Sequence, residues 1–182
     1  YTRNGDDGDT YLLFGKKVSK DDIRVECYGA IDECMSNLGV AKILSEDQNL
    51  TSIAEVIINI QRKLFIISSE IACPVEKYKE MKDKYSFITQ EMIDEIESQI
   101  DYFQQNSPEI KFFVLPGSSL LSSHIDISRT ICRKAERLCV KIAEKKLLNN
   151  KKNLILLNRL SDLLFILARY VDRDKEYVKA SE

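Results

Sequence analysis

The feature that most constrains the fold is an uninterrupted helical repeat between residues 51 and 73. Apolar residues recur there at alternating spacings of four and three, which places them on one face of a helix. The members of the repeat are Ile53, Ile57, Ile60, Leu64, Ile67 and Ile71. Pro74 ends the repeat, because proline cannot continue a helix. A seam of this length must be buried against other helices, which predicts a helical bundle.

Four further segments carry the same spacing, and they are predicted at about 22–44, 89–105, 119–148 and 151–172. The first follows Ser19-Lys-Asp-Asp22, which matches a capping box, and the second follows Thr89, a predicted N-cap. Residues 74–88 are predicted to form a charged, mobile loop. Since strand-like alternation and internal repeats are not seen, we expect one all-α domain, a five-helix up-down bundle over residues 22–172.

Composition limits the classes of function. The chain has 182 residues and a net charge of −2, so it lacks the basic excess of a general nucleic-acid binder, and any polyanion contact must be local. No apolar run reaches the roughly 18 residues of a membrane span. One histidine argues against a histidine-rich metal site. Five cysteines without a Cys-x-x-Cys motif favour a reducing compartment, either the cytoplasm or, after removal of a leader, the mitochondrial matrix.

A charged stripe lies on the segment predicted at 119–148. Arg129, Arg133, Glu136 and Arg137 fall on one helical face, beside an apolar flank that includes Ile125. The stripe could be ordinary solvated surface. It could also hold a polyanion, because arginine binds phosphate in a planar fork.

The first 21 residues are polar and rich in turn-forming residues. Three glycines lie there among hydroxyl and lysine side chains, including Thr10 and Lys20. Glycines allow backbone amides to approach a phosphate, so the segment could bind a nucleotide. It has no ordinary P-loop, however, and its composition alone favours a solvated turn.

Three other features have open interpretations. Asp32 lies in a stripe of small residues and is predicted to be a buried charge that needs a partner, for which an arginine of the stripe is the candidate. Asn158 and Asp162 could form an interhelical hydrogen-bond network. Phe113, close before Pro116-Gly117, could be a loop anchor or a cofactor contact.

Taken together and in order, these pieces resemble the PduO-type ATP:cob(I)alamin adenosyltransferases. The motifs are Tyr1-Thr-Arg-Asn-Gly5 to Thr10, Ser19 to Asp22, Tyr28-Gly-Ala-Ile-Asp-Glu33, Phe113-Val-Leu-Pro-Gly117, Arg129 to Arg137, Leu157 to Phe165 and Ala168-Arg-Tyr170. The resemblance covers almost the whole chain. It implies a homotrimer of five-helix bundles with active sites between subunits.

The resemblance also implies roles for individual residues. Those assigned to ATP are Thr2, Arg3, Asn4, Gly5, Thr10, Tyr11, Lys20, Arg133, Glu136, Arg137 and Asn158. Arg129 would pair with Asp32 of a neighbouring subunit, and Phe113 would wall the cobalamin site and exclude the lower axial base. Tyr11, Ser118 and Asp126 depart from the residues that are frequent in the family at those positions.

The implied reaction is transfer of the 5′-deoxyadenosyl group of ATP to cobalt, with magnesium as an expected companion of the triphosphate. Residues 1–21 would be the nucleotide-binding loop and residues 173–182 a frayed tail of the same single domain. A reductase and an adenosylcobalamin-dependent enzyme are possible partners, whereas nucleic acid and membrane are not expected. The competing class is a non-catalytic helical module, either a nucleotide sensor or an adenosylcobalamin carrier.

Overall fold

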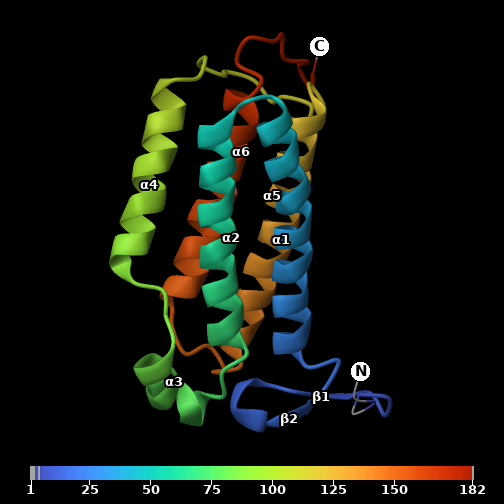
Figure 1. The fold of residues 1–182 in the computed structure, drawn as a ribbon, viewed down its shortest axis with the longest axis vertical. Helices are drawn as coiled ribbons and strands as arrows, with labels where there is room; N and C mark the ends of the chain where they lie inside the picture. Colours follow the sequence, from blue (N-terminus) through green and yellow to red (C-terminus); the bar gives the residue numbers. More distant parts are fainter. Residues whose placement is uncertain (1–2, 4, 182) are drawn as a thin grey trace.

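The structure is a computed structural model that describes residue 3 and residues 5–181. Long helices run roughly parallel to one axis and make up most of the molecule (Figure 1). They are α1 (Ile23–Asp47), α2 (Thr51–Ile71), α4 (Gln90–Gln105), α5 (Leu120–Glu144) and α6 (Lys152–Tyr170). The predicted all-α class and the five predicted helices are confirmed. The helices α5 and α6 end slightly earlier than the helices predicted at 119–148 and 151–172.

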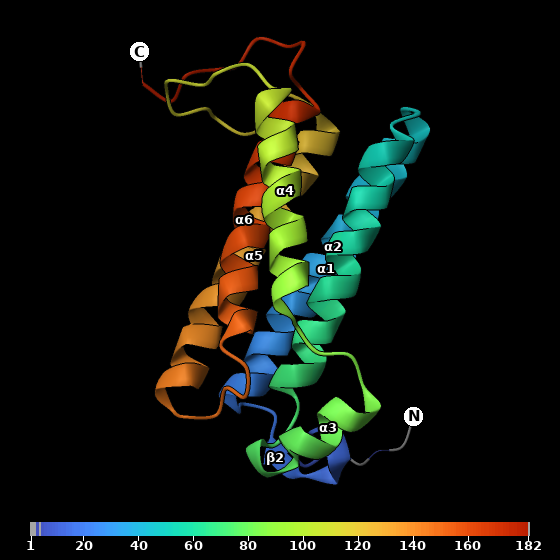
Figure 2. The ribbon, with the colours of Figure 1, turned by 90° about the vertical axis from the view of Figure 1, so that its left-hand side faces the viewer.

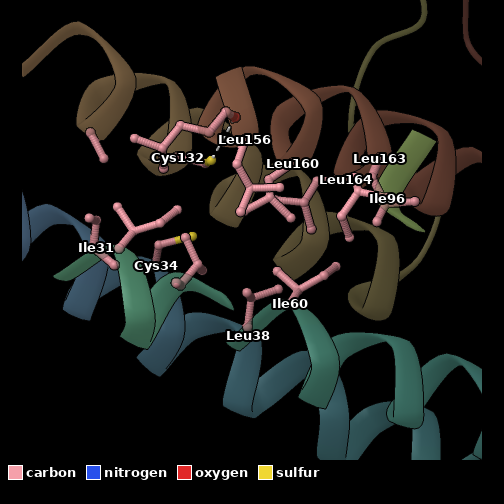
Figure 3. Packing of buried hydrophobic residues seen from close by; sticks show 14 of the residues in the cluster. Ile31, Cys34, Leu38, Ile60, Ile96, Cys132, Leu156, Leu160, Leu163 and Leu164 are labelled. Carbon is pink, nitrogen blue, oxygen red and sulfur yellow. Dashed lines mark hydrogen bonds between the residues drawn. The ribbon is translucent and has the colours of Figure 1, made fainter. Parts of the chain in front are cut away.

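The helices form two groups around one core. α1 packs on α2 and α5, α5 also packs on α6, and α4 is attached mainly through α6. A second view shows the α1–α2 pair diverging from α4 and α6 toward the end that carries the C-terminus (Figure 2). The apolar seams meet between the groups, where Leu38, Ile60, Cys132 and Leu160 are fully buried (Figure 3).

A small antiparallel hairpin precedes the bundle. Strand β1 (Asp9–Tyr11) pairs with β2 (Lys17–Ser19), and a short 3-10 turn, Leu13–Gly15, connects them. The described part of the turn-rich N-terminal segment therefore contains an ordered hairpin. The predicted capping box is wrong, because Ser19 ends β2 and Asp22 alone caps α1, accepting a hydrogen bond from the backbone N of Arg24 at 2.9 Å.

Residues 74–88 are not an irregular loop. A 3-10 turn, Val75–Lys77, leads into the short helix α3 (Tyr78–Lys84). Met81 of α3 is fully buried, and its burial explains why a charged segment is folded here. The sequence pattern missed the helix because one buried side chain in seven residues gives no periodic signal.

The tail is likewise more structured than expected. The backbone N of Leu115 donates to the carbonyl of Val178 at 2.9 Å, and the N of Ala180 donates to the carbonyl of Phe113 at 2.8 Å. These bonds frame an isolated β-bridge between Val114 and Lys179. The described part of the tail is therefore paired with the connection between α4 and α5 instead of being frayed.

A buried carboxylate joins the lower ends of several elements. Glu70 of α2 is 1% exposed. Its oxygens accept hydrogen bonds from the Tyr78 hydroxyl at 2.7 Å, the backbone N of Ile88 at 2.9 Å and the side-chain amide of Asn150 at 3.0 Å. One side chain thus fixes α3, the start of α4 and the turn between α5 and α6.

We predict that Glu70→Gln lowers the free energy of unfolding by about 1–3 kcal/mol, because the new amide NH2 group would face hydrogen-bond donors in a buried site. Chemical denaturation measures the change. Glu80→Gln is the control, since Glu80 makes only exposed ion pairs with Lys77 and Lys84, and its effect should be much smaller. Equal effects of the two substitutions would contradict the assigned role of Glu70.

Candidate active site

The arginine stripe borders a cavity of about 770 Å³. Arg129 and Arg133 line it from α5, and Asp162 and Phe165 line it from α6. Residues of α4 and of the following segment 107–110 complete its wall. The cavity therefore combines two guanidinium groups and two carboxylates with one aromatic face, and only its α5 wall is suited to an anionic ligand.

Glu136 is tied to α6 at the lower edge of the stripe. Its carboxylate accepts a hydrogen bond from the side-chain amide of Asn158 at 3.2 Å. The amide oxygen of Asn158 in turn accepts from Arg159 at 2.8 Å, and Arg159 pairs with Glu97 of α4 at 2.6 Å. The structure thus brings together Glu136 and Asn158, and it bears out the alternative that Asn158 joins an interhelical network.

Arg133 and Arg137 remain on the exposed side of α5. In the part of the chain that the structure describes, neither forms an ion pair within 4.0 Å. Neither guanidinium group is therefore held in a direct ion pair by a carboxylate of the described residues. This distinguishes the two arginines from an ordinary network of surface ion pairs.

The N-terminal segment is held in a defined shape. The ammonium group of Lys20 donates to the carbonyl of Gly5 at 2.7 Å, and a Cβ added to Gly5 would lie 3.0 Å from that nitrogen. Thr10 is half-buried in β1, and Tyr11 is 52% exposed. Arg3 adopts a positive φ of 59°. Thr2 and Asn4, also assigned to ATP, lie outside the described residues.

The hairpin is attached to the lower end of α2. Leu12 is buried, and the backbone N of Leu13 donates to the carbonyl of Ala72 at 3.0 Å. Lys16 pairs with Glu76 at 2.8 Å. Gly8 and Gly15 adopt positive φ values, as the turns around the hairpin require. The predicted nucleotide loop is therefore a fixed platform.

Phe113 lies at the other end of the molecule, in the connection between α4 and α5. It is 86% exposed, an unusual environment for a phenylalanine side chain. The preceding Phe112 is less exposed and lies 5.1 Å from the Lys179 ammonium group. The backbone of Phe113 is fixed by the tail, so its ring is presented to the outside from an anchored segment.

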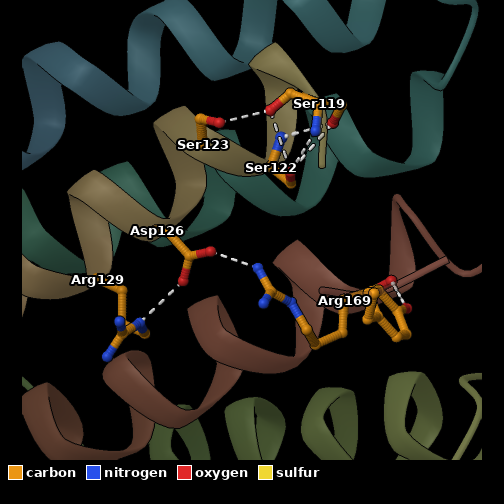
Figure 4. A network of polar contacts seen from close by, with 7 residues as sticks. Ser119, Ser122, Ser123, Asp126, Arg129 and Arg169 are labelled. Atoms are coloured by element: carbon orange, nitrogen blue, oxygen red, sulfur yellow. Dashed lines mark hydrogen bonds and ion pairs between the residues drawn. The ribbon is translucent and has the colours of Figure 1, made fainter. Parts of the chain in front are cut away.

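The expectation that Asp32 is a buried charge is wrong for the single chain, because Asp32 is exposed on α1. Arg129 does not pair with it within the chain. Its Nε instead donates to the carboxylate of Asp126, one turn earlier on α5, at 3.1 Å (Figure 4). Whether Arg129 meets Asp32 of another subunit remains a prediction.

A single chain separates the three predicted parts of the site. The hairpin lies at the lower end in Figure 1, whereas the connection that carries Phe113 lies at the upper end beside the tail. α5 runs between the two ends, and a helix of 25 residues is about 37 Å long. The chain therefore brings together Gly5 with Lys20, Arg129 with Arg133 and Glu136 with Asn158, but it does not join these groups to Phe113.

The cysteines are poor candidates for a nucleophile. All five are free and buried. Burial raises the pKa of Cys73 to about 11 and that of Cys139 to about 12, so both remain protonated thiols near neutral pH. Among the described residues there is also no cluster of three or more histidine, cysteine, aspartate or glutamate side chains that could hold a metal ion.

Comparison with known proteins identifies the group to which this fold and these residues belong. The family model described as cobalamin adenosyltransferase matches residues 1–171. This chain belongs to the cobalamin adenosyltransferase family. The resemblance seen in the sequence is therefore confirmed. The matched residues include the hairpin and the helical bundle.

Two bacterial relatives show how complete the match is. A corrinoid adenosyltransferase of Citrobacter freundii is 36% identical, with 93% of this chain and 92% of the relative covered. A corrinoid adenosyltransferase of Bacillus subtilis is also 36% identical, with 100% and 93% covered. The match thus spans nearly the full length of both relatives.

Solved adenosyltransferase structures share the fold. A phenylalanine-to-alanine variant of the PduO-type ATP:corrinoid adenosyltransferase from Lactobacillus reuteri, complexed with cobalamin and ATP, superimposes with a TM-score of 0.91 at 31% identity, covering 100% of this chain and 99% of that one. An arginine-to-lysine variant complexed with ATP gives a TM-score of 0.84 at 33% identity, with 98% of each chain covered. In the described part of this chain, no helix combines the length and apolarity needed to cross a membrane.

Sequence reasoning assigned no role to two residues that lie behind Arg129 of the cavity wall. Asp126 was noticed only as a departure from the adenosyltransferase pattern, and Arg169 only as part of a motif. Both are buried, at 4% and 2% exposure, and they form an ion pair between α5 and α6. The available signal was an acidic residue on the apolar flank of the predicted helix, which must find a cationic partner.

The carboxyl of Asp22, at the start of α1, should make a pH-dependent contribution to the stability of this adenosyltransferase. Arg24, 5% exposed, pairs with Asp22 at 2.8 Å, and these hydrogen bonds hold the pKa of Asp22 below its usual range. A carboxyl with a depressed folded-state pKa stabilises the protein above its unfolded-state pKa of about 3.9, and that stability is lost as the pH falls through the folded-state pKa.

We predict that Asp22→Asn lowers the free energy of unfolding by about 1 kcal/mol at neutral pH, because asparagine keeps the N-cap hydrogen bond but loses the charge that pairs with Arg24. The difference from the parent protein should shrink below about pH 4, where the parent carboxyl also takes up a proton. Denaturation curves across the pH range measure it. A difference that stays constant down to pH 2 would show that the Asp22 charge contributes nothing.

Proposed function

We propose that the chain transfers the 5′-deoxyadenosyl group of ATP to the cobalt of cob(I)alamin, giving adenosylcobalamin and triphosphate. The family match over residues 1–171 carries this conclusion. The relatives are named corrinoid adenosyltransferases, and the solved Lactobacillus reuteri structure holds both cobalamin and ATP. The site supports the same reaction, because the guanidinium groups of Arg133 and Arg137 suit a polyanionic leaving group.

The reaction needs few chemical groups from the protein. The electron pair of cobalt(I) attacks the 5′-carbon of the ribose, a cobalt–carbon bond forms, and the bond from that carbon to the phosphate oxygen breaks. Because the nucleophile is the substrate's own metal, no serine, cysteine or histidine base is required. Buried cysteines with raised pKa values are compatible with this chemistry.

The protein's main task is to stabilise the leaving triphosphate. We assign this task to Arg133 and Arg137 of α5 and to Lys20 beside the hairpin. Preorganised cations at developing negative charge are the largest catalytic contribution in many enzymes. Glu136, held by Asn158, would orient the nucleotide at the edge of this cationic surface.

The other nucleotide contacts are assigned to the N-terminal segment, as the adenosyltransferase resemblance implies. They are Thr2, Arg3, Asn4, Gly5, Thr10 and Tyr11. Glycine at position 5 permits close backbone approach, which the contact with Lys20 already illustrates. We regard residues 1–182 as one domain, with this segment as its nucleotide loop.

We further propose that the active site is shared between subunits of a homotrimer. In one chain the hairpin and the α4–α5 connection that carries Phe113 lie at opposite ends, so a second copy is needed to complete the site (Figure 1). Apolar side chains are exposed along the faces available for contact, with Val40 and Ile43 on α1 and Ile127 and Val140 on α5. In the trimer, Arg129 would pair with Asp32 of a neighbouring subunit.

Magnesium would accompany ATP. Mg²⁺ is generally bound by substrate phosphates, waters and one or two carboxylates, so it does not need a dedicated protein cluster. The residues here fit that mode, because Glu136 offers one fixed carboxylate at the cationic surface. A bound Mg²⁺ would add further positive charge at the triphosphate. A cytoplasmic location, a reductase partner and delivery to an adenosylcobalamin-dependent enzyme remain predictions.

The direct test is incubation with ATP, magnesium and reduced cobalamin, with the absorption spectrum of a new cobalt–carbon bond as the readout. We predict that Arg133→Ala slows turnover about 100-fold or more, because triphosphate charge is left unpaired. The control is Lys134→Ala, since Lys134 makes only an exposed pair with Glu33 at 3.4 Å. Near-parental kinetics of Arg133→Ala would contradict the assigned ATP contact.

The cobalt side gives a separate prediction. If the exposed ring of Phe113 excludes the lower axial base, Phe113→Ala should keep bound cob(II)alamin five-coordinate and slow its reduction, with little change in ATP affinity. The electron paramagnetic resonance spectrum of cob(II)alamin bound with ATP measures the coordination number. Phe112→Ala is the matched control. An identical four-coordinate signal in the parent and in Phe113→Ala would show that the ring does not exclude the base.

A further inference from the structure

A buried three-residue ion cluster lies directly behind the proposed site. One carboxylate oxygen of Asp126 accepts from Nε of Arg129 at 3.1 Å, and the other pairs with a terminal nitrogen of Arg169 (Figure 4). The Asp126 and Arg169 side chains are 5% and 3% exposed, whereas that of Arg129 is 24% exposed. The cluster therefore extends from the interior of the bundle to the wall of the cavity.

Arg169 is held firmly within α6. Its guanidinium group lies 5.6 Å from the ring of Phe165 and 6.0 Å from that of Tyr177. The hydroxyl of Tyr177 also donates to the Arg169 carbonyl at 2.7 Å. A buried arginine with aromatic neighbours has few alternative positions, so the direction of its bond to Asp126 is well defined.

Asp126 contacts Arg129 at Nε, the nitrogen nearest the helix. Among the described residues, the two terminal nitrogens of Arg129 make no hydrogen bond, and its guanidinium group lies 5.9 Å from the Phe165 ring. The inner edge of the guanidinium group is thus fixed from behind. The terminal nitrogens remain available as a fork for an oxyanion.

The charges of the cluster explain why it contains two arginines. With Arg129 alone, the carboxylate of Asp126 would offset the charge that faces the cavity. Arg169 supplies a second positive charge from the buried side, so the three groups together keep a net positive charge. The charge of Arg129 therefore remains effective toward an anion in front of it.

We propose that Asp126 and Arg169 are positioning residues, which orient Arg129 and preserve its charge for an oxyanion in the shared site. This inference rests on the proposed function. The oxyanion is a phosphate of ATP or the Asp32 carboxylate of a neighbouring subunit, two sources of the same chemistry. Neither positioning residue touches the substrate, and both act through Arg129.

The first experiment compares Arg169→Gln with Arg169→Lys in the full chain. Glutamine can still donate to Asp126 but removes the charge, so it should raise the KM for ATP, or the concentration at which the trimer dissociates, about tenfold or more. Lysine keeps the charge and should restore both values to within about threefold. The KM for cobalamin should not change in either variant.

The two readouts distinguish the sources. A raised KM for ATP in an intact trimer identifies the phosphate, and trimer dissociation in sedimentation identifies Asp32. Glu95→Gln is the matched control, because it removes a carboxylate paired with the buried Lys63 at 2.9 Å, on α4 and α2, and should change neither readout. Parental behaviour of Arg169→Gln, or equal losses with Arg169→Lys, would overturn the inference.

A double-mutant cycle provides the second experiment, and it decides the matter if Arg169→Gln does not fold. Asp126→Asn should lower kcat/KM for ATP about tenfold in the parent protein but have no further effect in Arg129→Ala. An equal effect in both backgrounds would mean a merely structural role and would overturn the inference. A parent protein that forms no adenosylcobalamin would instead contradict the proposed function itself.

Discussion

The rest of the structure depends on burial of the apolar flank of α5. Ile125, Cys132 and Cys139 are fully buried where this helix packs on α1 and α6. Successive residues of a helix differ in direction by about 100°, so burying one flank fixes the direction of every other side chain. Arg133 and Arg137 consequently face outward. Any rotation that turned them inward would expose the apolar seam and bury unpaired charge.

This constraint fixes the orientation of the groups that a single chain contributes to the site we propose. The hairpin is tied to α2 through the bond from Leu13 to Ala72, and the Phe113 segment is tied to the tail through the bond from Ala180. Both ends of the bundle therefore present fixed surfaces, with α5 as the connection between them. A neighbouring copy would meet groups that are already oriented, and less conformational entropy would then be lost on binding.

The sequence predicted most of the fold and part of the site, for different reasons. Helices such as α2 follow from local periodicity, and the family follows from the ordered motifs. The helix α3, the pairing of the tail with Val114 and the cluster around Asp126 depend on contacts between distant segments. Local patterns do not encode such contacts. The opposite charges of Asp126 and Arg169 can be read from the sequence, but their pairing depends on the packing of α5 on α6.

The same cluster changes the interpretation of Asp32. From sequence, Asp32 was expected to be a buried charge that required Arg129. In the structure Asp32 is exposed to solvent and Arg129 already has Asp126, so neither group is left as an uncompensated buried charge in one chain. In the trimer we propose, the pair would replace water at both groups, so it would select the correct partner surface more than it would stabilise the fold.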